Sequence, residues 1–164
     1  MTLALYPGSF DPFHNGHLEV VERAARLFGE IVIAGLRNPQ KAKSLFDLDS
    51  RRTMVEESIS HLDNVRFISM SKLTVEVAAD MDADVIIRGL RVVSDFESEL
   101  QMAQMNRHLS GIETVFIPTS ASHSFIASRL LREVATYGGD ISAFVPAPVA
   151  KIIAERLDGL TEGG

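Results

Sequence analysis

The sequence contains no cysteine among its 164 residues. Disulfide bonds, thiolate metal sites and cysteine nucleophiles are therefore excluded. The sequence also lacks any apolar run approaching the roughly 20 residues that a membrane-spanning helix needs. Its first residues, MTLALYPGSF, have no charged start followed by an apolar segment of about 7–15 residues, so they do not match a signal peptide. We therefore expect a cytoplasmic protein with no membrane partner.

An excess of basic charge is absent as well, because the formal net charge is -6. A general nucleic-acid binder usually carries a basic face, so the composition argues against a nucleic-acid partner. A small anion bound in a locally basic pocket stays compatible with it. Hydrophobic residues make up 46% of the chain, and we expect one domain over residues 1–164 with an ordinary buried core.

Strand-like runs rich in Val and Ile alternate with stretches of helical period along the chain. The predicted strands cover residues 3–6, 31–35, 65–69, 84–88 and 114–118. The predicted helices cover residues 16–28, 49–62, 73–81, 94–109, 124–136 and 147–157. This alternation predicts an α/β fold, a doubly wound five-stranded parallel sheet, and we expect the strand order 3-2-1-4-5.

Several helix ends are marked by their residue types. We expect the second, fourth and fifth helices to be capped by Asp49 or Ser50, by Ser94 or Asp95, and by Ser122 or Ser124. The glycine pair at 138–139 should end the fifth helix.

The loops after the first, fourth and fifth strands carry most of the candidate chemistry. They hold His14, His17, Arg88, Arg91 and His123. In the expected order these three strands adjoin each other, and the strand order reverses between the first and the fourth. Ligands of such sheets bind beyond the carboxyl ends of the strands at that point. We therefore predict the binding crevice there.

The stretch YPGSFDPFHNGH, residues 6–17, joins the first strand to the first helix. A helix start near Asn15 or Gly16 would present free N–H groups and a positive dipole end to an anion. His14 and His17 are three residues apart and can share one helix face. The stretch has neither the Gly-Lys-Ser/Thr of a Walker loop nor the Gly-x-Gly-x-x-Gly dinucleotide fingerprint. The alternatives are a structural histidine pair and a metal pair, and the second lacks a third ligand nearby.

A resemblance rests on four blocks of sequence. HNGH after PGSFDP resembles the His/Thr-x-Gly-His signature of the nucleotidylyltransferase superfamily, and IRGLR (87–91), DFESELQMAQMNRHL (95–109) and SFIASRLLREVA (124–135) follow. From about residue 3 to 157, the chain closely resembles the phosphopantetheine adenylyltransferase family. The resemblance implies a Rossmann-like nucleotidylyltransferase fold that converts ATP and 4'-phosphopantetheine to dephospho-coenzyme A and pyrophosphate. It also implies Mg²⁺ on the ATP phosphates rather than on a protein metal site, a homohexamer, and feedback by coenzyme A.

That reaction suits the residues. The nucleophile is a phosphate oxygen that is already ionised, so the protein must align two polyanions and neutralise charge rather than supply a strong base. Two other functions stay open: another adenylyltransferase, such as one acting on nicotinamide mononucleotide, and a non-catalytic nucleotide-binding sensor. Lys41, Thr74 and Arg88 argue against the first. His17 together with Arg88 and Arg91 argues against the second.

The resemblance implies a role for each residue that matches its motifs. His17 would stabilise the transition state, and the acceptor would be bound by Ser9, Lys41, Thr74 and Arg88, with Arg37 and Lys43 as neighbouring alternatives to Lys41. The residues implied to bind ATP are Ser9, Phe10, His14, His17, Gly89, Leu90, Arg91, Glu99, His123, Ser124, Phe125, Ile126, Ala127, Ser128 and Arg129. From residue type alone, Lys41 would be solvent-facing and Glu99 a solvated helix acid. Arg88 ends an apolar strand, where ligands bind, so a ligand contact is favoured over the alternative of a rim salt bridge.

This chain departs from the family pattern at a few of these positions. Relatives often have an aromatic residue where His123 stands, serines where Ala127 and Arg129 stand, and threonine where Ser9 and His14 stand. The missing hydroxyls alter the expected grip on the triphosphate. Arg129 either adds a compensating cation or points to solvent.

Overall fold

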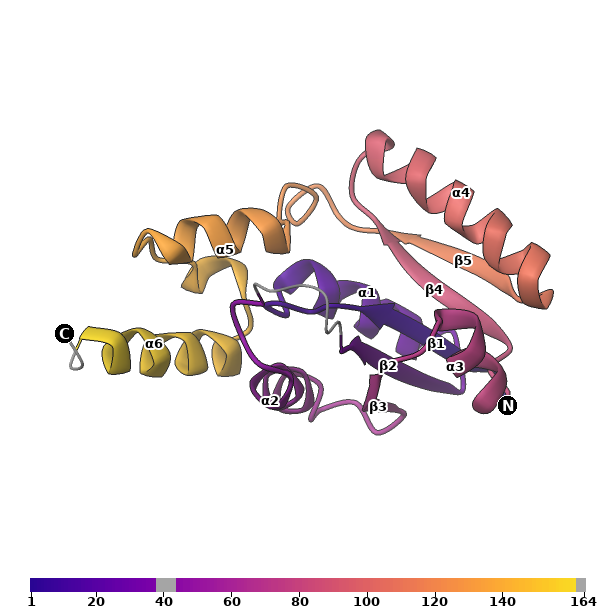
Figure 1. The fold of residues 1–164 in the computed structure, drawn as a ribbon, viewed down its shortest axis with the longest axis horizontal. Coiled ribbons are helices and arrows are strands. Elements are labelled where there is room, and N and C mark those ends of the chain that lie inside the picture. Colours follow the sequence, from indigo (N-terminus) through magenta and orange to yellow (C-terminus); the bar gives the residue numbers. More distant parts are fainter. Residues whose placement is uncertain (38–43, 162–164) are drawn as a thin grey trace.

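The computed structural model describes residues 1–37 and 44–161, and Lys41 and Lys43 lie outside this part of the chain. Strands and helices alternate along it (Figure 1). The elements are β1 (Leu3–Gly8), α1 (Asn15–Ala25), β2 (Glu30–Leu36), α2 (Leu48–Ser58), β3 (Val65–Met70), α3 (Thr74–Asp80), β4 (Val85–Leu90), α4 (Val93–Ser110), β5 (Glu113–Pro118), α5 (Ser128–Thr136), the 3-10 turn η1 (Ser142–Phe144) and α6 (Ala147–Thr161).

The strands form one parallel sheet in the order β3-β2-β1-β4-β5, which confirms the predicted order. β1 pairs with β2 along its whole length. With β4, in contrast, the described residues of β1 pair only at Ala4 and Leu5, next to Val85 and Ile86. The carboxyl-terminal halves of β1 and β4 therefore separate (Figure 1) where the strand order reverses, which is the place predicted for the binding crevice.

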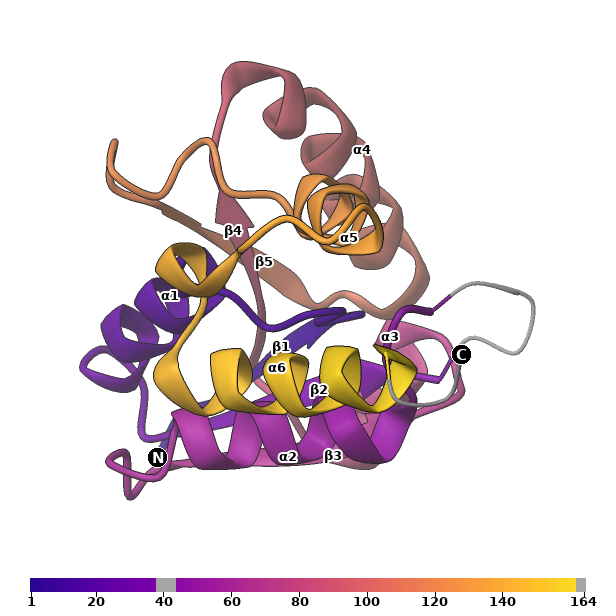
Figure 2. The same cartoon turned by 90° about the vertical axis from the view of Figure 1, so that its left-hand side faces the viewer.

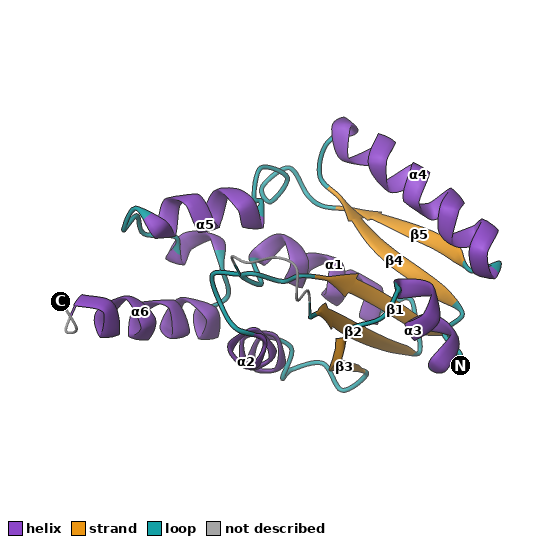
Figure 3. Ribbon diagram, in the orientation of Figure 1, coloured by secondary structure: helices purple, strands orange, loops and turns teal. Residues whose placement is uncertain are grey.

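Helices cover both faces of the sheet, as the apolar strands require (Figure 3). Successive strand residues point to opposite faces. Ala4 and Tyr6 belong to the larger core, which includes buried residues of α1 and α2, whereas Leu5 belongs to a smaller core with α3. Contacts of α4 with α3, β4 and β5 place α4 on the α3 side. No described helix has the length and apolar character that crossing a membrane requires.

The predicted helix ends are only partly right. The N-cap of α2 is Asp47, whose side chain accepts a hydrogen bond from the Ser50 N–H at 2.8 Å, so neither Asp49 nor Ser50 caps it. α4 begins after Val92 without a side-chain cap from the described residues, and Asp95 instead bonds to Arg91. Gly138, with φ of 78°, lies just past α5 and ends it as predicted.

The start of α5 is the largest difference from the prediction. The helix begins at Ser128, so Ser122 and Ser124 precede it and do not cap it. Residues 119–127 form turns, in which the Ile126 N–H donates to the His123 carbonyl at 3.1 Å. The Ile126 carbonyl accepts a hydrogen bond from the Arg91 guanidinium at 3.2 Å. In a helix that began earlier, this carbonyl would instead accept from a backbone N–H of the same helix. A tertiary contact therefore delays the helix.

α5 and α6 lie beyond the carboxyl ends of the strands (Figure 1). α6 packs along α2, as the view of Figure 2 shows. Arg156 of α6 lies over the ring of Phe46, 5.0 Å from its centroid. This packing holds α6 against α2 and leaves α5 beside the predicted crevice.

Candidate active site

A cavity of about 700 Å³ lies beyond the carboxyl ends of β1 and β4. It is lined by residues from both strands, from α1, from the first turns of α4 and from α5. The predicted residues that line it are Ser9, Phe10, His14, His17, Arg88, Gly89, Arg91, Glu99, Ser124, Phe125, Ala127, Ser128 and Arg129. The structure therefore gathers most of the predicted site from four separate parts of the sequence.

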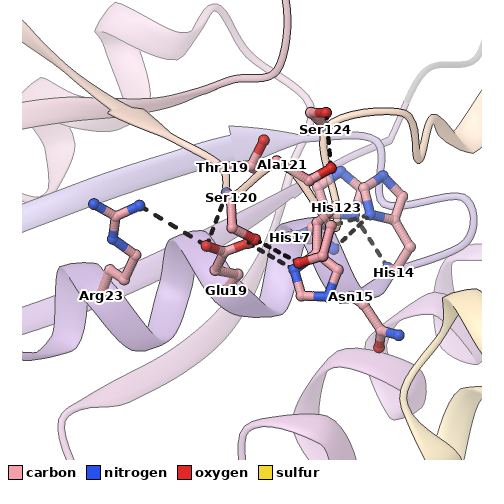
Figure 4. Close-up of polar contacts among 12 residues, drawn as sticks. His14, Asn15, His17, Glu19, Arg23, Thr119, Ser120, Ala121, His123 and Ser124 are labelled. Atoms are coloured by element: carbon pink, nitrogen blue, oxygen red, sulfur yellow. Dashed lines mark hydrogen bonds and ion pairs between the residues drawn. The ribbon is translucent and has the colours of Figure 1, made fainter.

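α1 begins with two histidines that bond to its backbone. His14 is the N-cap, and its Nδ1 accepts from the N–H groups of Gly16 at 3.1 Å and of His17 at 3.3 Å. The Nδ1 of His17 accepts in turn from the His14 N–H at 3.2 Å. The two rings stack with centroids 3.6 Å apart (Figure 4). The N–H groups of Gly16 and His17, two of the donors expected for an anion at this helix start, are therefore already bonded to the His14 ring.

The surroundings of both histidine rings favour the neutral form. Burial lowers the pKa of His17 well below its usual value, and nearby His14, Arg91 and Arg88 lower it further. Burial, Arg91 and His123 lower the pKa of His14 to about 3. Because each Nδ1 accepts a backbone hydrogen bond, the ring proton is assigned to Nε2. His17 can therefore donate one hydrogen bond from Nε2 without carrying charge.

The turn before α1 is tightly packed around Phe10. This residue has φ of 50°, in the left-handed region that bulky side chains rarely adopt. Its ring lies edge-on to His17, with centroids 5.1 Å apart, and also packs against Tyr6 and Phe13. A Cβ atom added to Gly8 would lie 2.9 Å from Phe10, so only glycine fits there without movement. The turn therefore packs the Phe10 ring edge-on against His17, while the rings of Phe13 and His14 stack on it.

Two arginines at the end of β4 each bind one carboxylate of α4. Arg88 donates from Nε and Nη2 to Glu99, both at 2.6 Å, and from Nη1 to the Pro7 carbonyl at 2.8 Å. Arg91 donates to Asp95 at 3.0 and 3.1 Å. Such two-pronged pairs fix a guanidinium group in one orientation. The carboxylates therefore hold both arginines at the cavity wall.

α5 begins at the cavity in a different way. No side chain among the described residues caps it at Ala127. Its first N–H groups have no partner within the helix. Arg129 and Arg132 line the cavity on the same helix, and Arg132 also donates to the Asp11 carbonyl at 2.8 Å. The helix start and these cations together form the part of the cavity best suited to a polyanion.

Comparison with known proteins bears on the identity of this site. A family model described as cytidylyltransferase-like matches residues 5–134. The chain is 51% identical over 158 residues to the phosphopantetheine adenylyltransferase of Gloeobacter violaceus, covering 96% of this chain and 98% of that protein. It is 46% identical to that of Heliobacterium modesticaldum, covering 99% and 97%. The chain belongs to the phosphopantetheine adenylyltransferase family. The phosphopantetheine adenylyltransferase of Prochlorococcus marinus is 49% identical over 152 residues, which cover 92% of this chain and 96% of that protein.

Not every residue that the family pattern implies lies at the cavity. Of the predicted residues that the structure describes, those outside the lining are Thr74, Leu90, His123 and Ile126. The backbone carbonyls of Leu90 and Ile126 accept hydrogen bonds from Thr119 and Arg91, which both line the cavity. Arg37 is exposed, and its N–H donates to the Met70 carbonyl at 2.7 Å.

Several residues of the site region were not predicted, and three of them are charged. Asp95 and Arg132 line the cavity. Arg51 is 5% exposed and donates to three carbonyls, those of Ser9, Leu36 and Phe46, at 2.6, 3.1 and 3.2 Å. The spacing of four residues between Arg91 and Asp95 is a signal that could have found that pair. Arg51 has no such signal, because its partners are backbone groups that the fold brings together.

Proposed function

We propose that this protein transfers the adenylyl group of ATP to 4'-phosphopantetheine, giving dephospho-coenzyme A and pyrophosphate. The observation that carries the proposal is the neutral His17, held between Phe10 and His14 at a cavity with four arginines. The three relatives named above are all phosphopantetheine adenylyltransferases. In the reaction, an oxygen of the acceptor phosphate bonds to the α-phosphorus, and the bond from that phosphorus to the pyrophosphate oxygen breaks.

His17 would act by donating a hydrogen bond rather than by moving a proton. Its Nδ1 is occupied by the His14 N–H, so the donor is Nε2. Negative charge accumulates on the α-phosphate oxygens as the acceptor attacks, and a fixed donor stabilises that charge most in the transition state. The attacking oxygen is already ionised and needs no base. A buried, neutral imidazole with one free N–H suits this task.

Arg88 would bind the phosphate of the acceptor. Guanidinium has five N–H donors, and three of them are bonded to Glu99 and Pro7. Glu99 would then orient Arg88 in addition to any contact of its own with the nucleotide. Arg88 can form the salt bridge with Glu99 and also contact a phosphate, because both residues line the cavity.

The triphosphate of ATP would lie at the start of α5. Ala127 leaves the first N–H groups of that helix without a side-chain cap from the described residues. Arg91, Arg129 and Arg132 supply positive charge nearby. Arg129 is 76% exposed at its side chain and lies 4.0 Å from Glu133, so it can turn toward a bound phosphate.

Magnesium would arrive as part of the ATP substrate. Within the described part of the chain, no group of three His, Cys, Asp or Glu side chains is placed to hold a metal ion. The carboxylates at the cavity, Asp95 and Glu99, are paired with arginines. These residues do not form a cation site by themselves, and the phosphate oxygens of ATP would be the ligands of the ion.

The assembly and regulation of the enzyme belong to the same proposal. Apolar side chains on α4 are exposed, among them Phe96, Met102, Met105 and Leu109, and they suit a contact between subunits. A homohexamer is the assembly to expect, with inhibition by coenzyme A and a cytoplasmic location. Light scattering of the purified protein tests the assembly, and adding coenzyme A to the assay tests the inhibition.

Release of pyrophosphate tests the activity. Purified protein is incubated with ATP or CTP, Mg²⁺ and one of two acceptors, 4'-phosphopantetheine or nicotinamide mononucleotide. We expect turnover with ATP and 4'-phosphopantetheine and little with the other combinations. Equal turnover of both acceptors would favour a different adenylyltransferase. Binding of ATP without pyrophosphate release from any combination would favour a nucleotide sensor.

A further inference from the structure

Glu19, on α1, is not among the residues that line the cavity, yet it is the centre of a polar cluster beside it (Figure 4). Its carboxylate accepts from the N–H of Ser120 at 2.9 Å and from the Ser120 hydroxyl at 3.0 Å. The Nδ1 of His123 lies 2.6 Å from the same carboxylate. Ser120 and His123 are more than a hundred residues from Glu19 in sequence, so these bonds tie α1 to the segment between β5 and α5.

That segment is held at three points. At its start, the N–H and hydroxyl of Thr119 donate to the Leu90 carbonyl at 2.8 and 3.2 Å. At its end, the Arg91 guanidinium donates to the Ile126 carbonyl. The Glu19 contacts lie between these two. The turns of residues 119–127 lead directly into α5, so their position sets where the α5 start lies.

Arg23 also contacts this polar cluster. Arg23, one helical turn after Glu19, lies 3.8 Å from its carboxylate and donates to the Pro118 carbonyl. The Glu19 side chain is 17% exposed. Burial raises the pKa of this carboxyl, but hydrogen bonds from His123 and Ser120 together outweigh that effect and lower the pKa. Glu19 is thus ionised, partly buried and held on two sides.

The ring of His123 bonds to Glu19, and His123 is not among the residues that line the cavity. Of the stretch 123–129 that the family pattern assigns to ATP, Ser124, Phe125, Ala127, Ser128 and Arg129 line the cavity, and His123 and Ile126 do not. The carbonyl of His123 lies near the first turn of α1, 3.7 Å from a Cβ atom added to Gly16. The ring and the backbone of His123 therefore both face α1.

We propose that Glu19 is a positioning residue for the nucleotide half of the site, which holds His123 and Ser120 against α1 and so places the α5 start for the triphosphate. His123 would then act as the anchor of the segment and not as a direct contact of ATP. The proposal rests on the function proposed above. It departs from the role that the family pattern implies for position 123.

The test compares four single variants and one double variant with the wild-type protein. Glu19→Ala removes the anchor, Glu19→Gln keeps its shape without the charge, and His123→Phe keeps a ring without the bond. Glu22→Ala is the matched control, because Glu22 lies on the same helix and also bonds to a histidine, His61, at 2.9 Å. Each variant is assayed for kcat and both KM values, and calorimetry measures its affinity for a non-hydrolysable ATP analogue.

Glu19→Ala should raise the KM and Kd for the nucleotide about tenfold, the scale of one hydrogen bond to a charged group. Its kcat and its KM for 4'-phosphopantetheine should stay within about twofold of wild type, because the anchor touches neither the acceptor nor His17. Glu19→Gln should weaken nucleotide binding roughly threefold, because the amide of glutamine has one acceptor oxygen where the carboxylate has two. Glu22→Ala should match wild type in all three constants.

The double variant Glu19→Ala/His123→Phe decides how His123 acts. If His123 only anchors the segment, the double variant binds the nucleotide about as weakly as Glu19→Ala alone. Additive losses would show that His123 contacts ATP and would overturn the proposal. Unchanged nucleotide affinity in Glu19→Ala would overturn it too, as would equal losses for both substrates with a lowered Tm. A wild-type protein that binds ATP but releases no pyrophosphate would instead overturn the proposed function, and the affinities would still test the anchor.

Discussion

Two helices begin at the same cavity, α1 and α5. At α1 the N–H groups of Gly16 and His17 bond to the ring of His14, and the His14 N–H bonds to the ring of His17. At α5 the N-cap residue is Ala127, and no side chain among the described residues caps the helix. Arg91 instead bonds the carbonyl just before the helix start, and Arg129 and Arg132 add positive charge within the first turns.

The difference separates two tasks that a helix start can perform. An anion binds a helix N-terminus through N–H groups that have no other partner. Those groups are occupied at α1, so α1 presents two neutral imidazoles to the cavity instead. At α5 no side chain among the described residues caps them, and Arg129 and Arg132 lie on the same helix. Under the proposed function, α1 would therefore stabilise the transition state and α5 would bind the triphosphate.

Removing His17 is the most severe test of this division. His17→Ala should lower kcat by about 10²–10³, the usual loss for one donor to a developing oxyanion. The affinity for ATP should stay within a few-fold, because α5 supplies most of the phosphate contacts. Steady-state kinetics and calorimetry measure the two effects. A nearly normal kcat with badly weakened ATP binding would show that His17 anchors the nucleotide and that the division is wrong.

Arg88 tests whether the nucleotide end of the cavity is distinct from the acceptor end. Arg88→Ala removes a charge-assisted contact and should weaken binding of 4'-phosphopantetheine by about 1.5–3 kcal/mol. ATP affinity should change much less, since Arg88 lies at neither helix start. Calorimetry with each substrate separates the outcomes. A loss mainly of ATP affinity would mean that the two ends are assigned the wrong way round.

A cap introduced at α5 would make it resemble α1. Ala127→Asp should stabilise the helix by about 1 kcal/mol, because a carboxylate is a good N-cap. The same carboxylate should repel the triphosphate and raise the Kd for ATP roughly 30-fold, or about 2 kcal/mol. Ala127→Ser is the control, since a hydroxyl caps without charge. Unchanged ATP affinity in Ala127→Asp would place the triphosphate elsewhere.

The fold was predictable because strong apolar runs marked every strand. The runs of β1 and β2 are buried on both faces of the sheet, whereas the edge strands β3 and β5 are buried only in part. The five strands lie in the predicted order. Helix starts were less predictable. A serine is a favourable cap in isolation, but at α5 the contact between Arg91 and the Ile126 carbonyl overrides that preference and moves the start to Ser128.

The site was predictable where residue type alone indicates phosphate chemistry. His17, Arg88 and Arg91 all line the cavity as predicted. The partners that orient such groups were harder to predict, because they depend on contacts between distant segments. Glu19 and His123 are 104 residues apart, and no local pattern pairs them. His14 as a cap was missed because an imidazole is not among the usual N-cap side chains.

The cap at α1 can also be tested through pH. The unfolded chain binds a proton on His14 below about pH 6.5, whereas the folded protein does not until about pH 3. Between these values the unfolded state holds the extra proton, so His14 lowers the free energy of unfolding by up to about 1.4 kcal/mol per pH unit as pH falls. His14→Asn keeps a capping side chain but cannot titrate. Urea unfolding from pH 7.5 to 4.5 should show similar stabilities near pH 7.5 and a shallower decline for the variant at lower pH. Parallel declines would mean that His14 is protonated in the folded protein, and the neutral cap that distinguishes α1 from α5 would be lost.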